Sequence, residues 1–294
     1  MQAAIAAVQT GFKNVLFATD FSDAAAQAIP YVREIAKRYD ANVLTLHVRP
    51  GRAHSLPYRT WTSNTKIAET EDERHREQIL AAFPDTRTSV LIKEGNVEDH
   101  LDSIIRSRDV DLVVIGTTGQ TRDGKHRLGS VAEEIFRSVT CPVLTVGLHS
   151  LWSSGSRFRK ILCAADQASD QSMAHALSLS QEFQSRLVLL SVISEQEAGY
   201  HVPTSQMAST SEYFLHNRLP PGAEGCCKPE YIVSYGDIAE KILEVESKTN
   251  PDLIVLGARS ERGIHGATGD LPIATAERIV SRPPAQCQRS GVSG

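Results

Sequence analysis

The residues with the clearest chemical meaning are small ones that follow an apolar run. Gly116 and Gly119 are followed, after nine further residues, by Gly129 and Ser130, in the pattern G-x-x-G-x9-G-S. Glycine lets a backbone approach an anion closely, and a serine hydroxyl and the free amides at a helix N-terminus can donate hydrogen bonds to phosphate. Each glycine taken singly is better explained by a turn. The four positions together favour a phosphate-binding loop.

A second polar group follows the first apolar run of the chain, at Ala18-Thr19-Asp20. If this run is a strand of a parallel sheet, Asp20 lies where ligands bind and could accept hydrogen bonds from a base or a ribose. The alternative role is to start the next helix, because Asp20 to Asp23 is rich in capping residues. Val48, at the end of the next run, is either an apolar wall for a base or a core residue, and His47 is expected to be a satisfied strand residue.

Signatures of covalent and metal chemistry are missing from the sequence. Gly119 to His126 nearly spells a P-loop, but His126 stands where that loop needs a hydroxyl. Neither an H-E-x-x-H pair nor a G-x-S-x-G elbow occurs. We therefore predict no catalytic residue and no metal bound by protein side chains alone.

Short apolar runs alternate with stretches that have helical periodicity. The predicted strands are Asn14–Thr19, Asn42–Val48, Thr88–Lys93, Leu112–Gly116 and Val143–Val146, and the predicted helices are Ala24–Tyr39, Val97–Arg106 and Val131–Val139. Such alternation predicts an α/β fold, a parallel sheet with helices on both faces. Ligands of such sheets bind at the carboxyl ends of the strands.

The chain repeats this pattern. Phe12–Asp20 is echoed by Phe158–Asp166, and Asp111–Gly116 by Asp252–Gly257. A length of 294 residues also suits two domains, at about 150 residues each. We predict a first domain over 12–148, a second over 158–282 and an irregular tail over 283–294.

The first copy resembles the universal stress protein family in its ATP-binding branch. The resemblance is carried by Val15–Ser22, Leu44–Val48, Asp111–Gly116 with the glycine pattern, and Cys141–Val146. It implies a Rossmann-like fold with a five-stranded parallel sheet in the order 3-2-1-4-5. It also implies ATP as ligand, often with a divalent metal such as Mg or Mn. The residues implied are Ala18, Thr19, Asp20 and Val48 around adenine and ribose, and Gly116, Thr118, Gly119, Gly129, Ser130 and Val131 at the phosphates.

The function implied is that of an ATP-binding stress-response regulator that is not an enzyme. Slow ATP hydrolysis is left open; it would be slow because no base or arginine finger for an attacking water is evident. One alternative is an interaction module that needs no ATP. Another is a nucleotide-using enzyme of the same fold, which is disfavoured because Thr19-Asp20-Phe21-Ser22 stands where adenylyl-transferring relatives have Ser-Gly-Gly-x-Asp-Ser.

The second copy departs from the pattern. Ser260 corresponds to Gly119, and Ile273-Ala274 to Gly129-Ser130, so the phosphate loop is broken. Asp270-Leu271-Pro272 is typical of a helix start. Residues 283–294 contain too many breakers for a buried strand, so we predict that the second sheet lacks its last strand. That loss leaves the edge at Val143–Val146 open to another molecule or covered in another way.

Composition narrows the remaining partners and the compartment. The net charge is −4, so no basic excess attracts nucleic acid or anionic lipid. No apolar run is long enough for a membrane span, and the first residues lack the charged region of a signal peptide. The five cysteines form no CxxC pair, which favours a reducing cytoplasm. We expect the two copies to pair within one chain, with a homodimer of chains as a further assembly.

Overall fold

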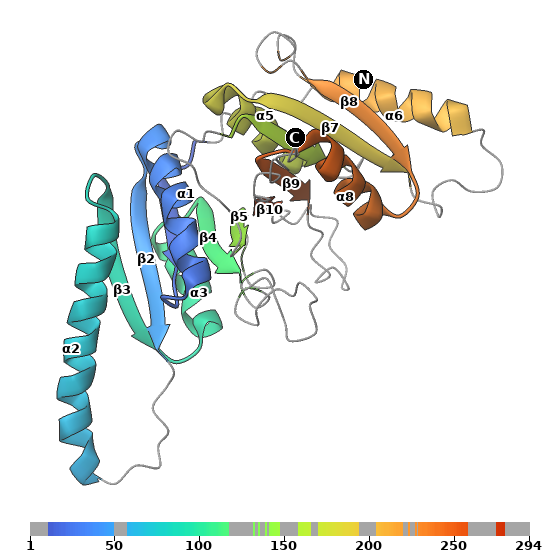
Figure 1. Ribbon diagram of the computed structural model, residues 1–294. Coiled ribbons are helices and arrows are strands. Elements are labelled where there is room, and N and C mark those ends of the chain that lie inside the picture. Colours follow the sequence, from blue (N-terminus) through green and yellow to red (C-terminus); the bar gives the residue numbers. More distant parts are fainter. Residues whose placement is uncertain are drawn as a thin grey trace, which may run out of the picture.

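The computed structural model describes residues 11–49, 58–117, 141–147, 158–165, 170–193, 204–219, 229–257 and 275–279, together with the single residues 132, 135, 139, 223 and 227. Helices alternate with strands along nearly all of this part of the chain (Figure 1). The elements form one ten-stranded sheet with the strand order β3-β2-β1-β4-β5-β10-β9-β6-β7-β8.

The first domain contains strands β1 to β5. Its elements are β1 (Asn14–Ala18), α1 (Asp23–Tyr39), β2 (Asn42–Arg49), α2 (Tyr58–Ala82), β3 (Arg87–Glu94), α3 (Val97–Ser107), β4 (Leu112–Thr117) and β5 (Val143–Gly147). All neighbouring strands within this domain are parallel. The predicted order 3-2-1-4-5 is therefore confirmed, and each predicted strand lies within a residue or two of its observed bounds.

The second domain repeats this order with one strand fewer. Its elements are β6 (Lys160–Ala164), α5 (Asp170–Phe183), β7 (Arg186–Ile193), α6 (Thr204–Arg218), β8 (Glu230–Tyr235), α8 (Ile238–Thr249) and β9 (Leu253–Gly257). Strands β8, β7, β6 and β9 lie side by side and parallel. The sheet has four such strands and lacks the last one, as the sequence predicted.

A short strand, β10 (Thr275–Ile279), joins the two sheets. It pairs parallel with β5 and antiparallel with β9. The sequence predicted a helix starting at Asp270-Leu271-Pro272, and this prediction is wrong for Thr275–Ile279, which form a strand. Residues 270–272 themselves lie outside the described residues. The physical reason is the unpaired edge of β5, whose backbone groups β10 satisfies. The edge at Val143–Val146 is thus covered in another way.

Each face of the first-domain sheet is covered by helices. On one face, α1 and the end of α2 pack against alternate residues of the strands, including Val15, Phe17 and Val114. On the other face, α3 packs against the intervening residues, such as Leu16 and Val113. Val15, Leu16, Val113 and Val114 are fully buried, which explains why these runs are continuously apolar.

Helix α1 shows how local sequence defines an element. Ser22 caps it, because its hydroxyl oxygen accepts a hydrogen bond from the Ala25 amide at 3.2 Å. The helix ends at Asp40, which takes a left-handed conformation with φ of 50°. The apolar residues predicted from helical spacing, which include Tyr31 and Ile35, are buried.

In both domains an aspartate carboxylate accepts hydrogen bonds from backbone amides at the start of the first strand. One oxygen of Asp111 accepts hydrogen bonds from the amides of Lys13 and Asn14 at 2.6 and 2.8 Å. Asp252, its equivalent, accepts from Arg159 and Lys160 at 2.8 and 2.9 Å. The repeat found in the sequence therefore includes the bonds that fix where the first and fourth strands of each domain begin.

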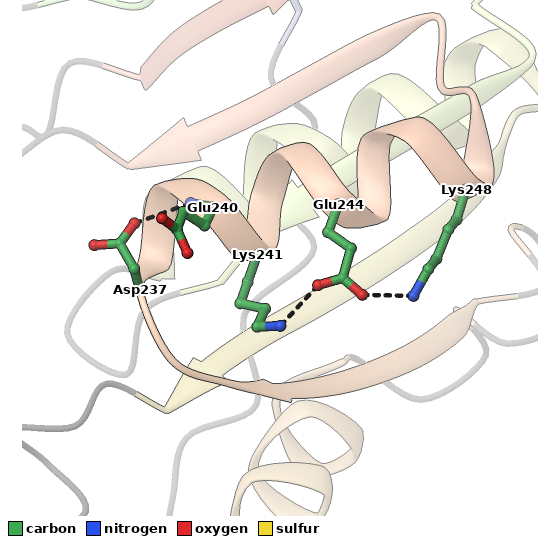
Figure 2. A network of polar contacts seen from close by, with 5 residues as sticks. All are labelled: Asp237, Glu240, Lys241, Glu244 and Lys248. Carbon is green, nitrogen blue, oxygen red and sulfur yellow. Dashed lines mark hydrogen bonds and ion pairs between the residues drawn. The ribbon is translucent and has the colours of Figure 1, made fainter.

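Helix α8 carries a surface network of charges along one side (Figure 2). Asp237 caps the helix by accepting from the Glu240 amide at 2.9 Å. Farther along, Glu244 accepts from Lys241 at 2.7 Å and from Lys248 at 2.6 Å. Hydrogen bonds from these two lysines lower the pKa of Glu244 to about 2. Among the described residues, no helix has the length and apolar character needed to span a membrane.

Candidate functional site

Five of the predicted site residues meet at the carboxyl edge of the first-domain sheet: Ala18, Thr19, Asp20, Val48 and Gly116. Ala18, the last residue of β1, is registered with Leu46 of β2 and Ile115 of β4. Val48 and Gly116 therefore extend to either side of the end of β1. Because parallel strands end at the same edge, β1, β2 and β4 form the region where such sheets bind ligands.

The loop after β1 is held by hydrogen bonds to its own backbone. The Thr19 amide donates to the Leu46 carbonyl at 2.9 Å, and the Thr19 hydroxyl accepts from the Phe21 amide at 3.0 Å. Oδ1 of Asp20 accepts from the Ser22 amide at 3.0 Å. The predicted capping role of this segment is confirmed. Asp20 is exposed, and no described residue donates to its Oδ2, so this oxygen can serve a ligand as well.

Three rings pack beneath this loop. Phe21 stacks on His75 of α2, with centroids 4.2 Å apart, and meets the edge of His47 at 4.7 Å. Phe21 has φ of 62°, a left-handed conformation that is uncommon for an aromatic residue. Burial lowers the pKa of His75, and the neighbouring His47 lowers it further.

His47 is a satisfied strand residue, as the sequence analysis expected. Its Nδ1 lies 2.8 Å from the Thr19 carbonyl oxygen, so this nitrogen carries the proton and donates. The bond fixes the end of β1 to β2. Sequence reasoning missed α2 entirely, and with it the contribution of His75. The polar composition of this helix conceals its few inward residues, of which Ile79 is buried.

Gly116 has a structural role that its place in the glycine pattern did not reveal. A Cβ atom on this residue would lie 2.4 Å from the carbonyl carbon of Ala24 and 2.4 Å from the amide nitrogen of Ala25. The first turn of α1 thus crosses β4 so closely that only glycine fits. Packing alone is sufficient to require this glycine.

The rest of the predicted phosphate loop lies outside the described residues. This applies to Thr118, Gly119, Gly129, Ser130 and Val131. The helix predicted over Val131–Val139 is represented by Ala132 and Ile135, which are helical and buried, and by the buried Val139. These three side chains pack with α3 in one apolar cluster, so the chain returns to the sheet after the loop.

Comparisons with known proteins agree with this architecture. The model of the universal stress protein family matches residues 11–147 and again residues 157–279. The chain belongs to the universal stress protein family. It has the tandem two-domain form, because the family model matches twice.

Two relatives and a solved structure extend the comparison of this universal stress protein. A universal stress protein of Methanocaldococcus jannaschii is 28% identical over 46% of this chain and 82% of its own length. A putative universal stress protein of Staphylococcus aureus is 30% identical over 48% of this chain and 87% of its own. The crystal structure of a universal stress protein from Archaeoglobus fulgidus covers 90% of this chain and 97% of its own, with a TM-score of 0.64 and 18% identity.

The second domain of this universal stress protein keeps the backbone bonds of the edge but changes its side chains. The Ala165 amide donates to the Leu190 carbonyl at 2.8 Å, as Thr19 donates to Leu46 in the first domain. By this register Ser191 takes the place of His47. The equivalent of Asp20, Asp166, lies outside the described residues. The second domain therefore has a serine in place of the imidazole that, in the first domain, holds the end of β1 to β2.

Proposed function

We propose that the first domain binds ATP at the carboxyl edge of its sheet, and that the protein acts as a nucleotide-binding regulator of a stress response. One observation carries the proposal. Strand β4 places Gly116, the first residue of the G-x-x-G-x9-G-S pattern, beside the end of β1, where Asp20 presents a free carboxylate oxygen. The residue proposed to accept from a base or ribose and the residue proposed to start the phosphate loop are therefore neighbours at one edge, which supports the proposal.

The described half of the site fits a nucleoside. Val48 is half-buried and packs on the apolar cluster beneath, which suits it to contact a base together with Ala18. Asp20 Oδ2 would accept from the base or a ribose hydroxyl. Thr118, Gly119, Gly129, Ser130 and Val131 would hold the phosphates through backbone amides and a hydroxyl. Mg or Mn, when bound, would neutralise phosphate charge; among the described residues no cluster of acidic or imidazole side chains would hold a metal without them.

Binding rather than turnover is the activity we propose. Asp20 and His47, two of the titratable groups at this edge, both make hydrogen bonds with the backbone that fix the loop. Fast phosphoryl transfer needs a group that orients the attacking water and a cation that stabilises the transition state. Among the described residues, neither Asp20 nor His47 is hydrogen-bonded to another side chain that would assign it such a role. ATP is therefore proposed as a ligand that changes the state of the protein.

Calorimetry with ATP and magnesium tests the proposal. The native chain should bind one ATP, and Gly129→Trp should abolish binding because the indole fills the loop. The matched control is Gly266→Trp, which places the same side chain in the corresponding loop of the second domain and should leave the affinity unchanged. Absence of binding by the native chain would refute the nucleotide proposal and favour the ATP-independent interaction module. Loss of binding in the Gly266 variant alone would place the site in the second domain.

A second pair of variants separates ligand contact from loop structure. Asp20→Asn keeps an oxygen that can accept from the Ser22 amide, whereas Asp20→Ala removes it. Both lose the charged acceptor, and a hydrogen bond to a charged group contributes about 1.5–3 kcal/mol, so each should weaken ATP binding at least about ten-fold. Only Asp20→Ala should also lower the urea midpoint. Native affinity in Asp20→Asn would show that Asp20 serves the turn alone.

A further inference from the structure

The two domains meet through equivalent surfaces. Helices α1 and α5 end alike, at Asp40 with φ of 50° and at Gln184 with φ of 54°, and two residues later β2 and β7 begin. Counting back from these ends makes Arg38 equivalent to Glu182, Tyr39 to Phe183 and Tyr31 to His175. All of these residues lie on the face where one apolar cluster runs without a break through both domains.

Contacts across this interface are reciprocal. Phe12 of the first domain stacks on His175 of the second, with centroids 6.4 Å apart and planes 7° apart. Phe158, the equivalent of Phe12, stacks on Tyr31, the equivalent of His175, at 6.3 Å and 28°. A contact that recurs with the roles of the two domains exchanged is the signature of an isologous, two-fold interface. The domains therefore pair as two subunits of a symmetric dimer would.

At the centre of such an interface, each residue meets its own equivalent. Tyr39 meets Phe183 with centroids 6.2 Å apart. Arg38 meets Glu182, with Nε of the guanidinium 2.7 Å from the carboxylate. Arg38 also donates to the Glu182 carbonyl, and its guanidinium carbon lies 5.9 Å from the centre of the Phe183 ring. The two copies thus carry opposite charges at the position that pairs with itself.

We propose that the Arg38–Glu182 pair makes this interface exclusive for a first domain joined to a second domain. If two first domains paired through the same face, Arg38 would meet another Arg38. If two second domains paired, Glu182 would meet another Glu182. Such like-charge contacts are the repulsive element that specific interfaces use against wrong partners. The partner that fits the α1 face is therefore the α5 face, which the same chain supplies.

Affinity and choice of partner come from different residues of the interface. Phe12 and Phe158 are no more than 2% exposed, so they provide the apolar contact of the interface. Arg38 and Glu182 remain 42% and 39% exposed. Water screens such a pair, so its contribution to stability is modest. Its effect on partner choice is larger, because every wrong pairing replaces attraction with repulsion.

A double-mutant cycle on the full chain measures this repulsion directly. Arg38→Glu creates the Glu–Glu contact of a second-domain pair, and Glu182→Arg creates the Arg–Arg contact of a first-domain pair. Each should lower the folding equilibrium constant about five-fold in urea titrations, and the double reversal should recover most of the loss. The same cycle on Arg106 and Asp102, an exposed pair within α3, serves as control and should show weaker coupling. Single reversals as stable as the native chain would refute the proposal.

A cleaved chain tests exclusivity itself. A protease site inserted between residues 148 and 156, which lie outside both family matches, allows the folded chain to be cut into two halves. The halves are unfolded in urea, refolded together and weighed by native mass spectrometry. Native halves should form mixed pairs in large excess, whereas Arg38→Gln with Glu182→Gln should yield a larger share of pairs of like halves. Equal amounts of like pairs in both samples would overturn the proposal; if the halves fail to refold, the cycle on the intact chain decides.

Discussion

Replacing Gly116 by alanine should destabilise the protein far more than a methyl group on a loop normally would. The added Cβ would lie 2.4 Å from Ala24 C and Ala25 N, whereas carbon atoms in contact are separated by about 3.5–4.0 Å. The first turn of α1 or the end of β4 must therefore move by about 1 Å. No truncation of a neighbouring side chain relieves this clash, because both atoms belong to the backbone.

The cost follows from what holds the two elements in place. Ala24 and Ala25 are buried, and α1 is fixed farther along by Val32, while β4 is bonded on both sides in the sheet. Overpacking a rigid site costs about 1–3 kcal/mol, and a backbone clash belongs at the upper end. We expect a loss of about 3 kcal/mol in the free energy of unfolding, measured by urea denaturation followed by circular dichroism.

Gly11→Ala is the matched control, because a Cβ there would meet nothing within 4 Å. It should change the free energy of unfolding by less than about 1 kcal/mol. If Gly116→Ala is as stable as Gly11→Ala, α1 yields without cost and the packing role of Gly116 is wrong. ATP affinity measured on the folded fraction then tells whether Gly116 acts on the ligand directly.

Two further predictions concern groups that the fold places in unusual surroundings. Asp111→Ala and Asp252→Ala each leave two backbone amides at the start of a strand without their carboxylate acceptor. Each should lower the free energy of unfolding in urea by about 1–3 kcal/mol, with similar values because the geometry is repeated. A loss of stability in only one of the two variants would contradict this equivalence. Burial lowers the pKa of His175 below 6.5 and also lowers the pKa of His75. At pH values between the folded-state and unfolded-state pKa, the unfolded chain therefore binds more protons than the folded chain does. Stability should therefore be fully present above about pH 6.5 and fall as the pH drops, and His175→Phe should flatten this dependence; an unchanged slope would exclude His175 as its source.

Local pattern was sufficient for most of the architecture. Continuous apolar runs such as Leu112–Gly116 identified strands covered on both faces, since only those bury every side chain. Helical spacing found α1, and the capping residues before it gave its start. Helix α2 was not predicted from the sequence, because it lies at the outer part of the sheet and its exposed surface is polar. Strand β10 was not predicted from the sequence either, because its partners, β5 and β9, are distant in sequence.

The sequence by itself determined the repeat, the parallel α/β class of the fold and the residues that follow the strands at the carboxyl edge of the first domain, whereas the strand order 3-2-1-4-5 was implied by the family resemblance. These follow from short-range patterns, since strand periodicity and βα alternation permit few topologies. Only the tertiary structure decided that Gly116 makes room for α1, that His47 fixes Thr19, and that Arg38 meets Glu182. Each of these depends on backbone segments brought together across the fold, and no spacing along the chain encodes such a distance.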